Sequence, residues 1–217
     1  MSIEIVPAIL RRTYERIAED WDKVHTLASH IHIDVTDGVF AGDGTFRDVR
    51  HFKRLPDSQK IELHMMVHNP DHYIDDVADL NPARCLFHIE AFADGGHIDE
   101  TYTQLRSNSS SELGLAINPD TPWQWLEEQL PRIDFVLFMG VKPGYGGAPL
   151  EEKVFRNMGA FHKQHPDVPI TVDGSVNLTT VPKFVAAGAT ILCANSAIFE
   201  GEPPQVNIAR LQDAAVS

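Results

Sequence analysis

Short apolar segments and longer amphipathic segments alternate along the whole chain. Segments such as 61–67 and 134–139 are brief and mostly apolar, which is typical of strands buried on both faces of a parallel sheet. Between them lie stretches such as 14–28, where Ile17 and Trp21 recur at helical spacing. The pattern predicts strands at residues 3–9, 30–35, 61–67, 84–90, 113–117, 134–139, 170–173 and 190–194.

A helix or helical turn is predicted after each strand. Thr13 is a suitable N-cap for the first helix, Pro70 fits the first turn of another, and Gly188 follows the end of a third. The predicted helical segments are 14–28, 47–55, 69–80, 97–106, 121–130, 150–165, 179–187 and 204–214. This repeated alternation predicts a closed (β/α)8 TIM barrel of the α/β class, with residues 1–217 as a single domain.

The charge balance narrows the function classes. The chain has 217 residues and a formal net charge of -13, which disfavours nucleic acid and anionic membrane surfaces as partners. No apolar run approaches a membrane span and the first residues lack the features of a signal peptide, so we expect a cytoplasmic protein. Cys85 and Cys193 lie in apolar segments without CxxC spacing, and we interpret them as small buried hydrophobes.

Polar residues gather at the C-terminal ends of the predicted strands, where TIM barrels place their active sites. In the second strand His30, His32 and Asp34 share one face, because side chains two residues apart in a strand point the same way. The other strand-end residues are His64, His88, Glu90, Asn118 and Asp173. Imidazoles and carboxylates that converge at one barrel mouth suit a divalent transition metal. For any one of them, the alternative is a hydrogen-bonded polar residue at the rim.

Three loops at the same end are candidates for binding an anion. The loops after the seventh and eighth strands commonly hold phosphate in TIM barrels through backbone N–H groups; here they are 173–176 and 194–197. The glycine-rich loop 143–147 lets its backbone approach a ligand closely and close over it. The residues predicted to bind substrate in these loops are Gly144, Gly146, Gly147, Gly174, Ser175, Asn195 and Ser196.

Eight sequence motifs, spread over nearly the whole chain, occur together in one order. They are VPAIL (6–10), HIDVTDG (32–38), LHMMV (63–67), FHIEA (87–91), AINPDTP (116–122), VKPGYGG (141–147), VDGSV (172–176) and NSAIF (195–199). In this order the chain resembles the ribulose-phosphate 3-epimerases, whose fold is a (β/α)8 barrel. The co-occurrence is far more specific than any single motif.

The resemblance implies a metal-dependent isomerase that interconverts D-ribulose 5-phosphate and D-xylulose 5-phosphate in the pentose phosphate pathway. It implies that Asp34 and Asp173 are the acid/base pair, and that Met66 and Met139 line the pocket of a phosphorylated ketose. It also implies a homo-oligomer, since family members commonly are. The implied ligands of one divalent ion (Zn2+, Fe2+, Mn2+ or Co2+) are His32, Asp34, His64 and Asp173.

Several positions depart from the family pattern. Ala8 stands where the family usually has serine, and Ser175 and Asn195 stand where it usually has glycine. Further departures are Thr36 for methionine, Lys142 for asparagine and Tyr145 for phenylalanine. The implied metal and acid/base residues are therefore kept, whereas the surroundings of the substrate are altered.

These departures leave other functions open. One is 3-epimerisation of another sugar phosphate, such as allulose 6-phosphate, because relatives of that kind also have an Asp-Gly-Ser sequence on the seventh strand. Another is a sugar-phosphate-binding barrel that no longer turns its ligand over. A decarboxylase of the orotidine-phosphate group is disfavoured, because the Asp-x-Lys-x-x-Asp array of that group has no counterpart after Asp34.

Overall fold

The computed structural model describes residues 3–93, 97–144 and 147–216. Its strands pair in parallel in the order β1 to β8, and β1 pairs with β8, so that the sheet closes into a barrel. The strands are β1 (Glu4–Ile9), β2 (Ile31–Thr36), β3 (Ile61–Met66), β4 (Arg84–His88), β5 (Glu112–Ile117), β6 (Phe135–Met139), β7 (Ile170–Asp173) and β8 (Ile191–Ala194). The predicted TIM barrel is confirmed.

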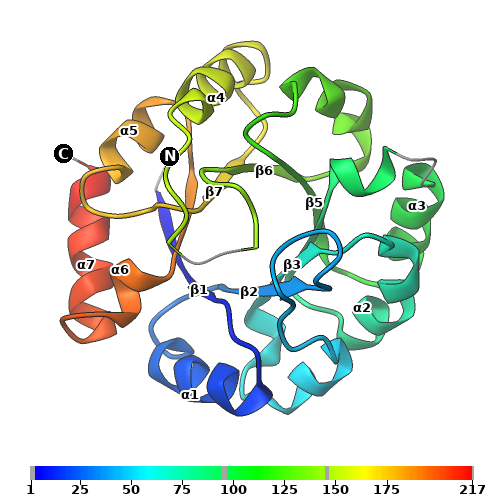
Figure 1. Ribbon diagram of the computed structural model, residues 1–217, viewed down its shortest axis with the longest axis horizontal. Coiled ribbons are helices and arrows are strands. Elements are labelled where there is room, and N and C mark those ends of the chain that lie inside the picture. The colour runs from blue at the N-terminus through cyan, green and yellow to red at the C-terminus, as the bar shows by residue number, and fades with distance from the viewer. Residues whose placement is uncertain (1–2, 94–96, 145–146, 217) are drawn as a thin grey trace.

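Helices surround the strands, as Figure 1 shows in a view along the barrel. The α-helices are α1 (Tyr14–Val24), α2 (Ile74–Leu80), α3 (Ile98–Asn108), α4 (Lys153–Gln164), α5 (Val181–Ala186), α6 (Ser196–Phe199) and α7 (Pro204–Ala215). The 3-10 helices are η1 (Val49–Arg54), η2 (Ser58–Lys60), η3 (Pro70–Tyr73), η4 (Ile89–Phe92) and η5 (Trp123–Arg132). None of the helices in the described part of the chain is long and apolar enough to cross a membrane.

The helical predictions were correct in place but not always in type. Thr13 caps α1 by accepting a hydrogen bond from the backbone N–H of Arg16, as expected. The segment predicted as a helix over 121–130 is instead the 3-10 helix η5, which contains Pro131. Proline has no N–H to donate and its ring clashes with the carbonyl four residues earlier, which opposes an α-helical end to this segment. The short helix α6, after β8, was not predicted from the sequence.

The strands are buried on both faces, which explains their nearly continuous apolar sequences. Every residue of β2 and β3 is buried, including His32, Asp34 and His64. Their outward side chains pack under the helices, while the inward side chains fill the barrel, so the polar residues of β2 do not face bulk water. His30 was expected on the same face as His32, but it precedes β2 and pairs with Glu4 instead.

Tight packing between β5 and β6 generates a test of the barrel. A Cβ atom added to Gly114 would lie 2.5 Å from ring atoms of Phe135, a buried side chain on the neighbouring strand. We expect Gly114→Ala to lower the free energy of unfolding by about 1–3 kcal/mol, because overpacking forces the ring or the backbone to shift.

Gly159→Ala is the matched control for this measurement. Gly159 lies inside α4, and a Cβ atom there meets nothing within 4 Å. The substitution should raise stability by up to about 1 kcal/mol, since alanine has the higher helix propensity. Urea denaturation of both variants checks the pair, and equal effects at the two sites would contradict the packing argument.

Candidate metal and active site

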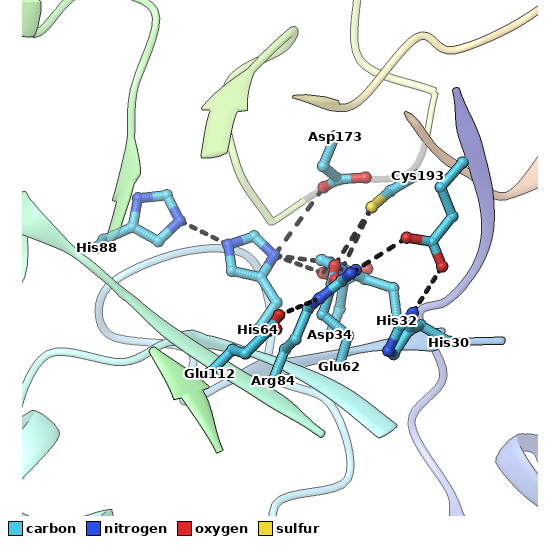
Figure 2. Close-up of polar contacts among 11 residues, drawn as sticks. His30, His32, Asp34, Glu62, His64, Arg84, His88, Glu112, Asp173 and Cys193 are labelled. Atoms are coloured by element: carbon cyan, nitrogen blue, oxygen red, sulfur yellow. Dashed lines mark hydrogen bonds and ion pairs between the residues drawn. The ribbon is translucent and has the colours of Figure 1, made fainter. Parts of the chain in front are cut away.

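Four side chains from three strands converge at the C-terminal end of the barrel. Cross-strand register pairs Asp34 on β2 with His64 on β3, and Asp173 ends β7. His64 Nδ1 lies 2.8 Å from Asp34 Oδ1 and 3.1 Å from His32 Nε2. Asp173 Oδ2 lies 4.0 Å from the same His64 nitrogen (Figure 2).

This donor set fits a divalent transition ion. The candidate ligand atoms of His32, Asp34, His64 and Asp173 all lie within 4.8 Å of one another, and three of the four residues are fully buried. Two imidazole nitrogens and two carboxylate oxygens are the borderline and hard donors that such ions take. Four lone-pair donors facing one another without solvent are costly unless a proton or a cation lies between them. The sequence-derived ligand set is therefore brought together by the fold.

The two carboxyl groups of this cluster have opposite pKa shifts. Burial raises the pKa of Asp34, but hydrogen bonds and charge from His32 and His64 outweigh it and hold the pKa well below its usual value. Burial and the negative charge of Asp34 together raise the pKa of Asp173 to about 6. In the metal-free pair the first proton therefore stays on Asp173 while Asp34 is ionised, which is the division expected of a base and an acid.

Other strand-end residues lie beside this cluster but do not offer a ligand atom to it. His88 Nε2 lies 2.9 Å from His64 Nε2, on the far side of the ring from Asp34. Glu90 is bonded to His88 and accepts the backbone N–H of Asn118. His88, Glu90 and Asn118 are thus linked by hydrogen bonds beside the candidate metal site.

Two neighbours of His32 were missed from the sequence. Glu62 Oε1 lies 2.6 Å from His32 Nδ1, and Cys193 Sγ lies 3.5 Å from the same nitrogen. These residues form a second group that can hold a metal, and it shares His32 with the first. One signal was present: Glu62 is two residues before His64 and so faces the same way in its strand. Cys193 is buried as expected and packs against Val6, Ala8 and Ile191, but its thiol also contacts His32 and Glu62.

A cavity of about 510 Å³ opens above the four converging side chains. Asp34 and Asp173 lie at it, together with Met66 and Met139. The predicted loop residues that line it are Gly144, Gly147, Gly174, Ser175, Asn195 and Ser196. Gly146, also predicted to bind substrate, lies outside the described residues. A larger cavity of about 770 Å³ lies at the opposite end of the barrel, where Glu4, Arg84 and Glu112 line it, far along the strands from the converging donors.

The altered positions change the wall of the smaller cavity in specific ways. Asn195 does not project its amide freely, because its Nδ2 donates a hydrogen bond to the carbonyl of Ala8. Ser175 adopts a left-handed backbone with φ of 56°, directly after Gly174 with φ of 99°. The side chain of Ser175 is thus held in a backbone region that favours glycine.

Two loops meet above the cavity through glycine backbones. A Cβ atom on Gly42 would lie 2.2 Å from the carbonyl oxygen of Gly144, and both residues have positive φ. Gly42 belongs to the loop after β2 and Gly144 to the loop after β6. Contact between these loops therefore requires glycine on both sides.

Comparison with known proteins identifies the family of the chain. The model of the ribulose-phosphate 3 epimerase family matches residues 4–199. The chain belongs to the ribulose-phosphate 3-epimerase family. It is 33% identical to "Ribulose-phosphate 3-epimerase" of Rhodobacter capsulatus over 230 residues, covering 99% of this chain and 96% of that protein. It is also 33% identical to the protein of that name from Bacillus subtilis, covering 91% of this chain and 92% of the relative.

Solved structures with the same barrel are more distant in sequence. A structure of 3-hexulose-6-phosphate synthase aligns with a TM-score of 0.66 at 14% identity, covering 98% of this chain and 99% of that one. KGPDC from Streptococcus mutans aligns with a TM-score of 0.69 at 11% identity, covering 100% and 98%. At this identity the likeness concerns the fold alone, so the epimerase family and not these neighbours guides the functional argument.

The raised pKa of Asp173 predicts how the metal-free epimerase-family barrel responds to Asp173→Asn. In the unfolded chain this carboxyl ionises near pH 3.8, whereas in the folded protein it holds its proton to about pH 6. Ionised Asp173 is therefore less favourable in the folded protein than in the unfolded chain. This destabilisation grows as pH rises between the two pKa values and is complete above the higher one. We expect the variant to be more stable than the unsubstituted protein by roughly 1–3 kcal/mol at pH 8.

The gain should be much smaller near pH 4, where the carboxyl is protonated in the folded protein and close to its pKa of 3.8 in the unfolded chain. Chemical denaturation of both proteins after chelation of metal, at pH 4, 6 and 8, measures the difference. A gain that is independent of pH would mean that Asp173 does not carry the buried charge inferred for it.

Proposed function

We propose that the chain is a metal-dependent isomerase that interconverts D-ribulose 5-phosphate and D-xylulose 5-phosphate by epimerisation at carbon 3. The observation that carries the proposal is the pair Asp34 and Asp173. They reach one point from strands that are not neighbours, at the base of a cavity of about 510 Å³, with pKa values shifted in opposite directions. Family membership supports the reaction and the names of the relatives support the sugar.

Two carboxyl groups meet the demand of this chemistry. Inverting a carbon next to a ketone requires that one group removes a proton from one face and another returns a proton to the opposite face. In the metal-free protein the pKa of Asp34 is lowered and that of Asp173 is raised, which supports Asp34 as the base for one epimer and Asp173 as the donor to the other face. In the reverse direction the two residues exchange roles.

His32, Asp34, His64 and Asp173 would hold the divalent ion. Once bound, it supplies Lewis-acid polarisation of the ketone, which lowers the energy of the enediolate between the two proton transfers. The two histidines and two carboxylates suit Zn2+, Fe2+, Mn2+ and Co2+ alike, and selection among these ions often follows their availability. The buried walls of β2 and β3 keep bulk water from the ionised Asp34.

The phosphate of the substrate would lie at the loops after β7 and β8. Backbone N–H groups around Gly174, Ser175, Asn195 and Ser196 can hold a dianion without a net positive charge, which suits a chain of charge -13. Met66 and Met139 supply a weakly hydrated wall between this end and the carboxylates. Gly144 and Gly147 would cover the ligand from the loop after β6.

The decisive experiment reloads the metal-stripped protein with one divalent ion and incubates it with D-ribulose 5-phosphate in deuterated water. Deuterium should enter carbon 3 while xylulose 5-phosphate appears, as followed by NMR. Metal removal should abolish both signals and reloading should restore them. Absence of exchange in protein that demonstrably holds the ion would reject ribulose 5-phosphate as substrate.

Substitution of each carboxylate separates the two proton transfers. With the ion bound, Asp173→Asn should slow interconversion by about 10²–10⁴-fold, because one face lacks its proton donor. Asp34 would still exchange the carbon 3 proton of one epimer without inverting it. In Asp34→Asn, Asp173 should still exchange the carbon 3 proton of the other epimer without inverting it.

Asp120→Asn is a suitable control for these variants, because Asp120 is an exposed carboxylate paired with Lys153. It should leave both exchange and inversion unchanged. If neither single variant retained exchange with either epimer while metal content stayed normal, the assignment of one carboxylate to each face would be wrong.

A second candidate substrate has structural support of its own. Ala8 lines the cavity at a position where the family usually has a serine hydroxyl. The hydrogen bond from Asn195 Nδ2 to the Ala8 carbonyl restricts the movement of this part of the wall. A longer ketose phosphate such as allulose 6-phosphate is therefore to be assayed beside the pentose phosphate. Binding of either sugar without exchange would point to a non-catalytic barrel.

Two further properties are proposed, the first from the family and the second from the sequence. We expect a homo-oligomer, which sedimentation equilibrium would detect, and a cytoplasmic location. Nucleic acid and anionic membranes are not expected as partners, because the charge of -13 opposes both.

A further inference from the structure

The two histidines of the metal site face it with different ring nitrogens. His32 presents Nε2, which lies 3.2 Å from Asp34 Oδ1, whereas His64 presents Nδ1, which lies 2.8 Å from the same oxygen. A neutral imidazole has one nitrogen with a lone pair and one with a hydrogen. To bind an ion, His32 must therefore carry its hydrogen on Nδ1 and His64 must carry its hydrogen on Nε2.

A fully buried carboxylate faces the outer nitrogen of His32. Glu62 Oε1 lies 2.6 Å from His32 Nδ1, and neither side chain has any solvent exposure. The second oxygen of Glu62 accepts from Arg84 Nη1 at 3.0 Å. Because an ionised carboxylate only accepts hydrogen bonds, this contact places the hydrogen of His32 on Nδ1.

Arg84 holds Glu62 from the other side. Its guanidinium also contacts Glu4 at 3.2 Å. It contacts Glu112 at 3.0 Å (Figure 2). Three carboxylates around one planar donor group fix its orientation, since the guanidinium has donors in a rigid fork. Glu62 is thereby kept in one position although it lies in the interior of the barrel.

A second chain of contacts faces the outer nitrogen of His64. His88 Nε2 lies 2.9 Å from His64 Nε2, and the two rings are stacked with an interplanar angle of 21°. His88 Nδ1 lies 3.3 Å from Glu90 Oε2. The hydrogen of His88 therefore belongs on Nδ1, facing the carboxylate, and its Nε2 is left to accept the hydrogen of His64.

We propose that Glu62 and His88 are positioning residues that fix opposite tautomers of His32 and His64 in the metal-loaded protein, so that both lone pairs face the ion. The inference rests on the metal site within the proposed function but not on the proposed reaction. When the hydrogen-bond partner of a ligating histidine's outer nitrogen is removed, the metal affinity of the site typically falls 10–100-fold.

The tautomers also decide between the two clusters that can hold a metal. In the group His32, Glu62 and Cys193, the ion would need the lone pair of His32 Nδ1. The contact with Glu62 assigns that nitrogen a hydrogen, so the ion belongs to the cluster with Asp34 and Asp173. Cys193 then remains a thiol.

The direct test reads the hydrogens in the unsubstituted protein. Nitrogen-15 NMR of histidine-labelled protein loaded with Zn2+ should show His32 protonated at Nδ1 and His64 protonated at Nε2. Zn2+ is diamagnetic and no sugar is needed. The same tautomer on both histidines, or the reverse pair, would overturn the proposal.

Variants test the consequence for affinity by competition with a chelator. Glu62→Gln should weaken Zn2+ binding by about 10–100-fold, while Glu112→Gln, which removes a different partner of Arg84, should leave it within about twofold. His88→Leu should weaken binding similarly, whereas His88→Gln, whose amide oxygen can accept from His64, should restore most of the affinity. Equal affinities of His88→Leu and His88→Gln would show a merely structural role and reject positioning by His88.

Cobalt gives an independent reading of the second cluster. Protein loaded with Co2+ should lack the near-ultraviolet charge-transfer band of a cobalt thiolate, and Cys193→Ala should bind Co2+ as tightly as the unsubstituted protein. A thiolate band that Cys193→Ala abolishes would place the ion in the cluster of Glu62 and overturn the proposal. If the tautomers are as expected but ribulose 5-phosphate is not turned over, the reaction fails and the positioning stands.

Discussion

The contact between His32 and Glu62 is the interaction on which the polar interior of the barrel depends. A closed barrel of parallel strands has an interior filled by side chains, and most such interiors are apolar. Here the cross-strand register places His32 directly beside Glu62, and the two meet at 2.6 Å without solvent. Burying a carboxylate is costly unless it is paired, so the charged groups around Glu62 have to be arranged to pair with it.

Two layers of charge follow from it along the barrel. Towards the N-terminal end Arg84 neutralises Glu62 and also binds Glu4 and Glu112. Charge from His32 and Arg84 holds the pKa of Glu62 near 2, although burial raises it. Towards the C-terminal end Asp34 and Asp173 contact only histidines, and no lysine or arginine in the described part of the chain pairs with either carboxylate. The fold thus balances its charges at one end and leaves acceptors unbalanced at the other, which is where a cation is needed.

The sequence was sufficient for the strands, because period and apolar content are local properties of each segment. It was sufficient for the polar residues at the strand ends too, since the rule for barrel active sites turns strand order into position, whereas the choice of four ligands among them came from the resemblance to the family. It was insufficient for Glu62, whose partner His32 lies 30 residues away and is set by register. Alternation also made His30 look equivalent to His32, yet His30 precedes β2 and bonds Glu4. The partner of a buried polar residue is thus set by the register between strands, which the pattern within one strand does not reveal.

The distribution of the unusual residues has a physical reason. His32, Asp34 and His64 are held by register inside strands buried on both faces, where a change in one would leave a buried partner without its bond. Ser175 and Asn195 lie in loops, where a new side chain can turn towards a neighbouring backbone, as Asn195 does towards Ala8. The residues proposed for metal binding and proton transfer thus lie within buried strands, while Ser175 and Asn195, which depart from the family pattern, lie in loops. Changes in the loops after β7 and β8 can therefore alter the cavity wall without disturbing the buried contacts within β2 and β3.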